Sequence, residues 1–271
     1  MAKLGILIAH YKEPLEQLKG MLDSINRQNI DFNQVKVCIL NDGDDVVFQQ
    51  SDFDGYNYSI ECSIAERCGT SKMRNKLLGL SKDDFVWFLD SDDYLIDDTL
   101  QDVLDELSST QNLDLMFVGA LWENKKNLTS QFYPDYYSFS IMGCSIFRRE
   151  FLINNNISSD ESVFLAGDVI LETLPKYYTG NRKRLNKPVL FYRYHPKSAV
   201  HNRKNNGWYD QAQIVMCHLI ERLISDGKIQ EAYYEYLHYV FTYNSKKVHD
   251  AFKDYFQELG MYTINFKMDL R

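Results

Sequence analysis

The sequence predicts an α/β fold, an open sheet flanked by helices, with a helical extension at its C-terminal end. Short apolar runs rich in branched residues alternate with amphipathic stretches of helical period through residues 1–120. From Trp208 onward the chain is rich in helix formers, with apolar residues at helical spacing. With 271 residues, 45% of them hydrophobic, the chain is long and apolar enough to bury a sizeable core.

The expected strands are apolar runs that end in polar residues, which is typical of buried parallel strands. They cover residues 4–9, 35–40, 56–62, 85–89, 113–121 and 189–194. The expected helices repeat apolar residues every three or four positions. Before the C-terminal extension they cover residues 15–25, 69–80, 98–107, 148–155 and 168–178.

Three polar clusters stand directly behind expected strands. They are His10 with Tyr11, Asn41 with Asp42, and the turn Asp90–Asp93. Open sheets of parallel strands bind ligands at the carboxyl ends of the strands. We therefore expect the three clusters to converge on one rim of the sheet and to form a binding site there.

The turn Asp90–Asp93 carries the sharpest chemical signal. Its aspartates end a buried strand and supply hard oxygen ligands, which suit Mg²⁺ or Mn²⁺. Carboxylates this close together, with Asp97 or Asp98 nearby, repel one another, and a cation relieves the repulsion. The alternative is a solvated helix cap without metal, because acidic residues after strands are common.

Composition argues against several classes of protein. The 38 acidic and 30 basic side chains give a net charge of −8, which disfavours broad binding to duplex nucleic acid or anionic lipid. The 5 cysteines form neither a CxxC pair nor a cluster at zinc spacing, as expected for reduced thiols. No secretory signal and no membrane-spanning apolar run is found, so we expect a cytoplasmic protein.

In combination, the motifs resemble those of family 2 glycosyltransferases of GT-A fold, along about the first 200 residues. The family's opening strand, aromatic turn and helix ending in Ser-Ile-x-x-Gln resemble LGILIAHYKEPLEQLKGMLDSINRQ. Its second strand and Asp-Asp-Gly turn resemble VKVCILNDGDD, with Asn41 in place of the first Asp. Its Gly, its Arg-Asn pair and its strand ending in Asp-x-Asp-Asp resemble ERCGTSKMRNKLLGLSKDDFVWFLDSDD. Its acceptor-side and base-bearing segments resemble GCSIFRREFL and LAGDVILETL.

The resemblance implies an inverting transferase that moves one sugar from a nucleoside diphosphate donor, expected to be UDP-linked, to an acceptor hydroxyl. It implies donor-binding roles for Ala9, Tyr11, Asp42, Arg74, Asp90 and Ser91. It implies that Mn²⁺ or Mg²⁺ bridges the donor diphosphate, held by Asp92 and by His195. Asp168 matches the family's general base, which takes the proton of the acceptor hydroxyl as that oxygen attacks the anomeric carbon.

Each of these roles has a simpler alternative. Asp168 stands where an aspartate often caps a helix. Arg74 fits an ordinary helix surface, and Asp42 fits an ordinary turn. His195 lies in a basic stretch that suits a solvated loop as well as a diphosphate site.

The expected organisation is a GT-A glycosyltransferase domain over residues 1–204 and a helical subdomain over residues 205–271. Within the first, residues 1–120 form the nucleotide-sugar-binding half and residues 121–204 the acceptor half. The tyrosine-rich C-terminal helices are expected to pack on the main domain. A homo-oligomer interface and an acceptor-docking face are the alternatives, because amphipathic rings suit both.

Two other classes of function stay open. One is a non-catalytic protein that binds nucleotide sugars or carbohydrate on the same fold. The other is a sugar nucleotidyltransferase, which normally shows a Gly-rich phosphate loop near its first strand, whereas HYKEP has no glycine. The acceptor also stays open: a cell-wall polymer or other glycan, a protein, and DNA are the candidates, and the net charge of −8 disfavours DNA without excluding it.

Overall fold

The computed structural model describes residues 2–43, 48–124, 126, 129–132, 142–194 and 207–261. Its strands are β1 (Leu4–His10), β2 (Val35–Asn41), β3 (Ser59–Ile64), β4 (Phe85–Asp90), β5 (Tyr94–Leu95), β6 (Leu115–Glu123), β7 (Thr129–Phe132), β8 (Ser145–Arg148) and β9 (Arg182–Tyr192). Its helices are α1 (Leu15–Asn26), α2 (Thr70–Leu80), α3 (Leu100–Ser109), α4 (Arg149–Asn154), α5 (Asp168–Tyr178), α6 (Trp208–Ser225), α7 (Ile229–Tyr243) and α8 (Lys246–Glu258).

The strands form one mixed sheet in the order β3-β2-β1-β4-β8-β6-β9-β5, with β7 paired to β6. β1 lies between β2 and β4 and runs parallel to both. The chain builds outward from β1 through β2 to β3 and then returns to β4 on the other side of β1. Open α/β sheets bind ligands at such a reversal, in the crevice outside the carboxyl ends of the strands.

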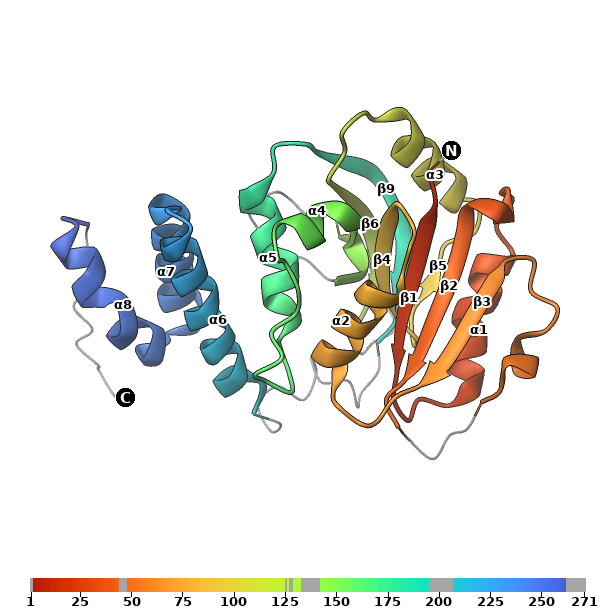
Figure 1. Ribbon diagram of the computed structural model, residues 1–271, viewed down its shortest axis with the longest axis horizontal. Coiled ribbons are helices and arrows are strands. Elements are labelled where there is room, and N and C mark those ends of the chain that lie inside the picture. The colour runs from red at the N-terminus through yellow and green to blue at the C-terminus, as the bar shows by residue number, and fades with distance from the viewer. Residues whose placement is uncertain are drawn as a thin grey trace.

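Helices cover both faces of the sheet (Figure 1). Ile6 and Ile8 of β1 pack on one face with Met21 of α1. The alternate residue Leu7 packs on the opposite face with Met73 of α2. Because successive side chains point to opposite faces of the sheet, the strands contribute to two cores. One core is shared with α1 and α3 and the other with α2, α4 and α5.

The C-terminal helices α6, α7 and α8 extend the molecule beyond α5, at the end away from β3 (Figure 1). Leu219 of α6 and Leu171 of α5 belong to one buried cluster, which also includes Tyr236 of α7 and Phe256 of α8. The helices therefore share a continuous core with the sheet. In the part of the chain that the structure describes, no helix is both long and apolar enough to cross a membrane.

The predicted fold class is confirmed, and most elements begin and end close to their expected bounds. β3 begins later than expected, at Ser59, and β9 begins earlier, at Arg182. The first half of β9 is rich in charged residues and has no apolar run, so the sequence pattern misses it. The short strands β5, β7 and β8 are absent from the prediction, because strands this short show no recognisable alternation of apolar and polar residues.

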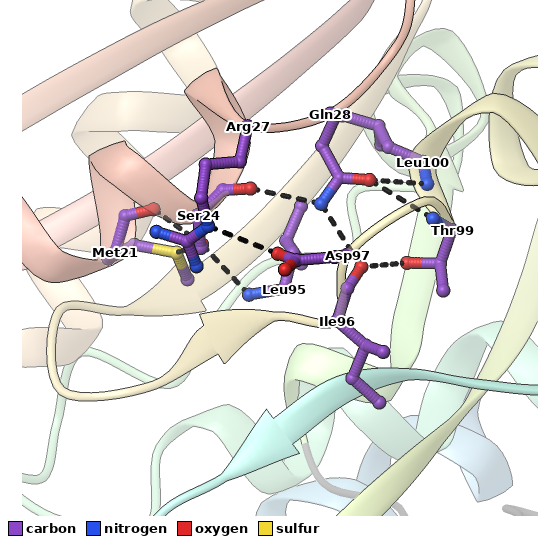
Figure 2. A network of polar contacts seen from close by, with 9 residues as sticks. All are labelled: Met21, Ser24, Arg27, Gln28, Leu95, Ile96, Asp97, Thr99 and Leu100. Atoms are coloured by element: carbon purple, nitrogen blue, oxygen red, sulfur yellow. Dashed lines mark hydrogen bonds and ion pairs between the residues drawn. The ribbon is translucent and has the colours of Figure 1, made fainter.

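A polar network joins the end of α1 to the segment between β5 and α3 (Figure 2). Among the described residues, the side chain of Gln28 bonds to four backbone groups. Its partners are the carbonyl oxygens of Ser24 and Ile96 and the amides of Thr99 and Leu100, at 2.9, 3.0, 3.1 and 3.1 Å. Ser24 Oγ accepts the amide of Leu95 at 2.9 Å. The network therefore fixes the segment that directly follows the turn Asp90–Asp93.

Candidate functional site

A cleft of about 250 Å³ opens at the carboxyl ends of β1, β2 and β4, where the strand order reverses. The starts of α2, α5 and α6 complete its walls. Strand register sets which residues meet at the rim. Ala9 pairs with Asp90 between β1 and β4, and His10 pairs with Asn41 between β1 and β2.

Every predicted site residue that the structure describes lines this cleft. They are Ala9, Tyr11, Asp42, Arg74, Asp90, Ser91, Asp92 and Asp168. The fold thus brings together residues that are far apart in the sequence, from three strand ends and two helices. The predicted metal ligand His195 lies outside the described residues.

The turn after β4 gathers carboxylates in a small volume. The Asp93 amide donates to the Asp90 carbonyl at 3.3 Å, and one oxygen each of Asp90, Asp92 and Asp93 lie within 4.8 Å of one another. Asp93 is buried, and burial together with the charges of Asp92 and Asp90 raises its pKa well above the usual range. A divalent cation that prefers oxygen ligands fits this turn, because it would offset the same repulsion.

Asp93 also ties the acidic turn to the end of β9. The Arg193 amide donates to Asp93 Oδ1 at 3.1 Å. The Arg193 guanidinium lies 5.3 Å from the ring centroid of Tyr94, which stacks on Phe191 with centroids 4.6 Å apart. The chain is therefore fixed beside the acidic turn two residues before the predicted ligand His195.

Asp42 is buried and fixes the chain before α2. Its carboxylate accepts the amide of Cys68 at 2.6 Å and that of Gly69 at 2.9 Å. Gly69 has a φ of +85°, a conformation that favours glycine. Asp42 is therefore more than an ordinary turn residue, since it places the first turn of α2 at the cleft.

Arg74 is buried on α2, so the alternative of an ordinary surface charge is wrong. Its Nη1 donates to Asp168 Oδ2 at 2.9 Å, and its Nη2 donates to Asp90 Oδ1 at 3.1 Å. Burial alone lowers the pKa of Arg74, but the carboxylates of Asp168 and Asp90 outweigh this and raise the pKa. One guanidinium thus links the predicted base to the acidic turn.

Asp168 is the first residue of α5, and its carboxylate bonds to Arg74 instead of capping the helix. Its side chain is 28% exposed and lines the cleft, so a ligand can reach it. A negative charge in the first turn of a helix is favoured by the helix dipole. The geometry therefore suits a carboxylate that can accept a proton from a ligand in the cleft.

Glu172, one turn along α5, is a buried carboxyl that no sequence motif points to. It is 5% exposed, and its Oε2 has no hydrogen-bond partner in the described part of the chain. Burial and the charge of Asp168 raise its pKa well above the usual range. Its spacing from Asp168 places both on one face of the helix, but nothing in the sequence distinguishes Glu172 from an exposed helical glutamate.

Beside the predicted Tyr11, other aromatic and cationic side chains stand at the rim of the cleft that the sequence motifs do not point to. The Arg67 guanidinium lies 4.6 Å from the ring centroid of Tyr11 and 5.9 Å from that of Phe164. Phe164 is 53% exposed and lines the cleft together with Tyr192 and Trp208. The aromatic content of 14% is the one sequence signal for such residues, and it does not say which rings reach the cleft.

A model of the family described as Glycosyl transferase family 2 matches residues 5–164 of the chain. This range includes β1, β2 and β4, whose ends carry Tyr11, Asp42 and the acidic turn of the cleft, and it stops before Asp168. No curated protein matches the chain.

The fold is similar to solved structures of S. aureus TarS. The crystal structure of S. aureus TarS has a TM-score of 0.71 and 20% identity, over 94% of this chain and 49% of that chain. This chain thus spans about half of its length. The crystal structure of S. aureus TarS 1-349 in complex with UDP-GlcNAc has a TM-score of 0.73 and 18% identity, over 94% of this chain and 81% of that chain. At these identities the likeness concerns the fold.

Proposed function

Since the chain belongs to glycosyl transferase family 2, we propose that it is a metal-dependent inverting glycosyltransferase. It moves one sugar from a UDP-linked donor to an acceptor hydroxyl. The observation that carries the proposal is one cleft that holds both an acidic turn and a partly exposed carboxylate on a helix start. A structure of similar fold, S. aureus TarS 1-349, has been solved with UDP-GlcNAc, which supports the UDP donor.

The nucleoside of the donor is placed against the ends of β1 and β2. The backbone at Ala9 and the ring of Tyr11 offer a polar edge and a stacking surface for the base. Asp42 accepts two amides, and a carboxylate has about four acceptor positions, so it keeps capacity for an N–H of the base. Arg74 lines the same pocket, and Asp90 with Ser91 is placed at the ribose.

Asp92 and His195 would hold Mn²⁺ or Mg²⁺ beside the donor diphosphate. When bound, the cation offsets the charge that develops on the departing nucleoside diphosphate. The oxygens of Asp90 and Asp93 within 4.8 Å of Asp92 support a hard cation, because such oxygen ligands suit Mg²⁺ and Mn²⁺.

Asp168 is the proposed general base. It takes the proton of the acceptor hydroxyl while that oxygen attacks the anomeric carbon and the bond to the diphosphate breaks. Arg74 occupies Asp168 Oδ2 in the structure, so Oδ1 is the oxygen that receives the proton. Because the displacement is a single step, the configuration at the anomeric carbon inverts.

The proposed acceptor is a hydroxyl of a glycan or cell-wall polymer. The exposed ring of Phe164 at the cleft, 53% exposed, suits the apolar face of a sugar. DNA is not favoured as the acceptor, because the net charge of −8 opposes a polyanion.

A thermal-shift screen of nucleotide sugars, with and without Mn²⁺, tests the function. A ligand that binds only the native state raises the melting temperature, so we expect UDP-sugars to raise it when Mn²⁺ is present. We also expect slow release of UDP by hydrolysis of the stabilising donor. Stabilisation without any UDP release would indicate a binding protein, and pyrophosphate formed from a nucleoside triphosphate and a sugar phosphate would indicate a nucleotidyltransferase.

A further inference from the structure

Arg74 stands between two carboxylates that come from different parts of the fold. Asp168 belongs to α5 and Asp90 to the end of β4, and their bonds to Arg74 measure 2.9 and 3.1 Å. Arg74 is 7% exposed, so its guanidinium has little freedom to move away. The bond occupies Asp168 Oδ2, and the Asp168 side chain stays 28% exposed. Arg74 thus pairs with two carboxylates that a substrate in the cleft can reach, and one of them is the proposed base Asp168.

The helices that carry this pair touch one turn away. Ser71 precedes Arg74 by three residues on one face of α2, and Gly167 directly precedes Asp168. A Cβ on Gly167 would lie 2.1 Å from Ser71 Oγ and 2.4 Å from the carbonyl oxygen of Asp160, too close for real atoms. The lack of a side chain at Gly167 therefore sets the distance between α2 and α5 at which Arg74 reaches Asp168.

We propose that Arg74 is a positioning residue that holds the Asp168 carboxylate in one orientation and acts on sugar transfer through it. This rests on the proposed function, in which Asp168 is the general base. A guanidinium presents its N–H groups in a rigid plane, so it fixes direction as well as distance, whereas a lysine ammonium is a point charge on a flexible stem. A displacement of about 1 Å at a catalytic group costs on the order of 10²-fold in rate.

The alternative role for Arg74 is contact with the donor alone. An arginine that only binds the donor changes donor affinity and leaves the rate at saturating donor unchanged. An arginine that acts through Asp168 lowers kcat, and it does so only while Asp168 is present. The two roles therefore separate in a double-mutant cycle.

The experiment measures UDP release from a UDP-sugar at saturating Mn²⁺, with water in place of the acceptor. Arg74→Lys is expected to lower kcat by about 30-fold, with less than about a threefold change in donor KM. In an Asp168→Asn background the same substitution is expected to lower kcat by less than about twofold, since the residue it acts through is gone. Lys72→Gln, which alters an exposed charge on the same helix, is the control and keeps kcat.

Gly167→Ala is a second variant that leaves every charge of the cleft in place. It is expected to lower kcat as Arg74→Lys does, by separating α2 from α5, and melting temperatures show which variants fold. Equal losses of kcat from Arg74→Lys in both backgrounds would overturn the proposal, as would a raised donor KM with unchanged kcat. No UDP release from the unmutated protein would instead reject the proposed function, and non-additive melting temperatures for Arg74→Lys and Asp168→Asn would still report the pair.

Discussion

Carboxyl groups in and around the cleft differ in exposure and in surroundings. Asp168 is 28% exposed and paired with Arg74. Asp93 and Glu172 are buried, and burial first, then like charges nearby, raises the pKa of each. Buried carboxyls with a raised pKa close to a more exposed carboxylate are typical of acid–base sites. The region of the cleft thus combines carboxylates within reach of a substrate with buried carboxyls whose pKa values are raised.

Replacing Asp92 tests the metal role. Asp92→Ala removes one of three carboxylates whose oxygens lie within 4.8 Å of one another. We expect the Mn²⁺-dependent affinity for a UDP-sugar to fall at least about tenfold, because the cation loses a hard ligand. Titration calorimetry with and without Mn²⁺ measures this, and Asp97→Ala changes an exposed aspartate after the same turn as a control. Full turnover of Asp92→Ala at excess Mn²⁺ would contradict the role.

Replacing Asp168 tests the base. Asp168→Asn keeps the size of the side chain and a partner for Arg74 but cannot accept the proton. Binding of UDP is expected to stay within about twofold, while transfer falls by about 10²- to 10⁴-fold, the usual contribution of a general base. Calorimetry with UDP and a UDP-release assay measure the two effects. Transfer at the normal rate by this variant would refute the assignment.

Glu172 is expected to make stability depend on pH. Burial and Asp168 raise its pKa well above 4.5, with Lys176 and Arg74 acting in the opposite direction. Above 4.5 the unfolded chain releases a proton that the native state still binds, so the free energy of unfolding falls as pH rises toward the raised pKa. Glu172→Gln removes this loss and is expected to gain stability over the unmutated protein between about pH 5 and pH 8, by at most about 1.4 kcal/mol per pH unit. Urea unfolding at both pH values measures the difference in stability. A gain that does not change with pH would contradict the prediction.

The positions that sequence could predict at this scale are those with a local pattern. Asp90 follows a buried strand, and Asp168 sits in a segment that resembles a family motif, so both were singled out. Glu172 and Arg67 were missed because their character depends on contacts across the fold. Glu172 becomes unusual through burial beside Asp168, and Arg67 through the rings of Tyr11 and Phe164.

At the scale of elements, the network around Gln28 holds in place the segment that directly follows the acidic turn (Figure 2). The turn itself bonds through Asp93 to Arg193, and Gln28 fixes the segment that follows it. The Ser-Ile-x-x-Gln ending of the first helix thus has a physical reason in this chain. Its serine and its glutamine both bond to backbone groups next to β5 and α3.

Gln28→Ala tests how much this network contributes to stability. It leaves the carbonyl of Ile96 and the amides of Thr99 and Leu100 without their side-chain partner. We expect a loss of about 2–4 kcal/mol in the free energy of unfolding, because each buried polar group left unpaired costs about 1–3 kcal/mol. Urea unfolding measures the loss, with Asn29→Ala at the exposed neighbouring position as the control. Equal stabilities for the two variants would show that the network contributes nothing.

Element boundaries were predictable where periodicity was strong. The helix from Asp168 to Tyr178 has the bounds that its apolar spacing predicts. Periodicity predicts only the apolar end of β9. Its charged first half pairs with Leu115–Val118 of β6 through the backbone, and backbone pairing produces no pattern in the side chains. β5 is a strand of two residues, and pairing with β9 alone defines it.

At the scale of the whole molecule, the C-terminal helices contribute to the cleft. Trp208, the first residue of α6, lines it. Gln211 Oε1 accepts the amides of Phe164 and Leu165 at 2.7 and 2.8 Å, and so holds the segment that leads to Asp168. The proposed boundary at residue 204 therefore separates segments that depend on each other in space. Sequence could not predict this dependence, because no motif links α6 to the strand ends.

Gln211→Ala tests the dependence. The variant leaves the amides of Phe164 and Leu165 without the acceptor that holds them. We expect a loss of about 1–2 kcal/mol in the free energy of unfolding and a several-fold lower rate of UDP release, because the segment before Asp168 loosens. Gln230→Ala, at an exposed position on α7, is the matched control. A Gln211→Ala variant with normal stability and normal rate would mean that α6 supports the cleft only through its apolar face.

The most direct test of the central claim is UDP release by the unmutated protein. The assay uses UDP-glucose and UDP-N-acetylglucosamine as probes, each with Mn²⁺ and again with the metal removed by EDTA. We predict that at least one probe yields UDP steadily when Mn²⁺ is present, and that EDTA or Asp92→Ala abolishes the release. Folded protein that binds a UDP-sugar with Mn²⁺ and yet releases no UDP, with or without glycan acceptors, would contradict the claim that this cleft transfers sugar.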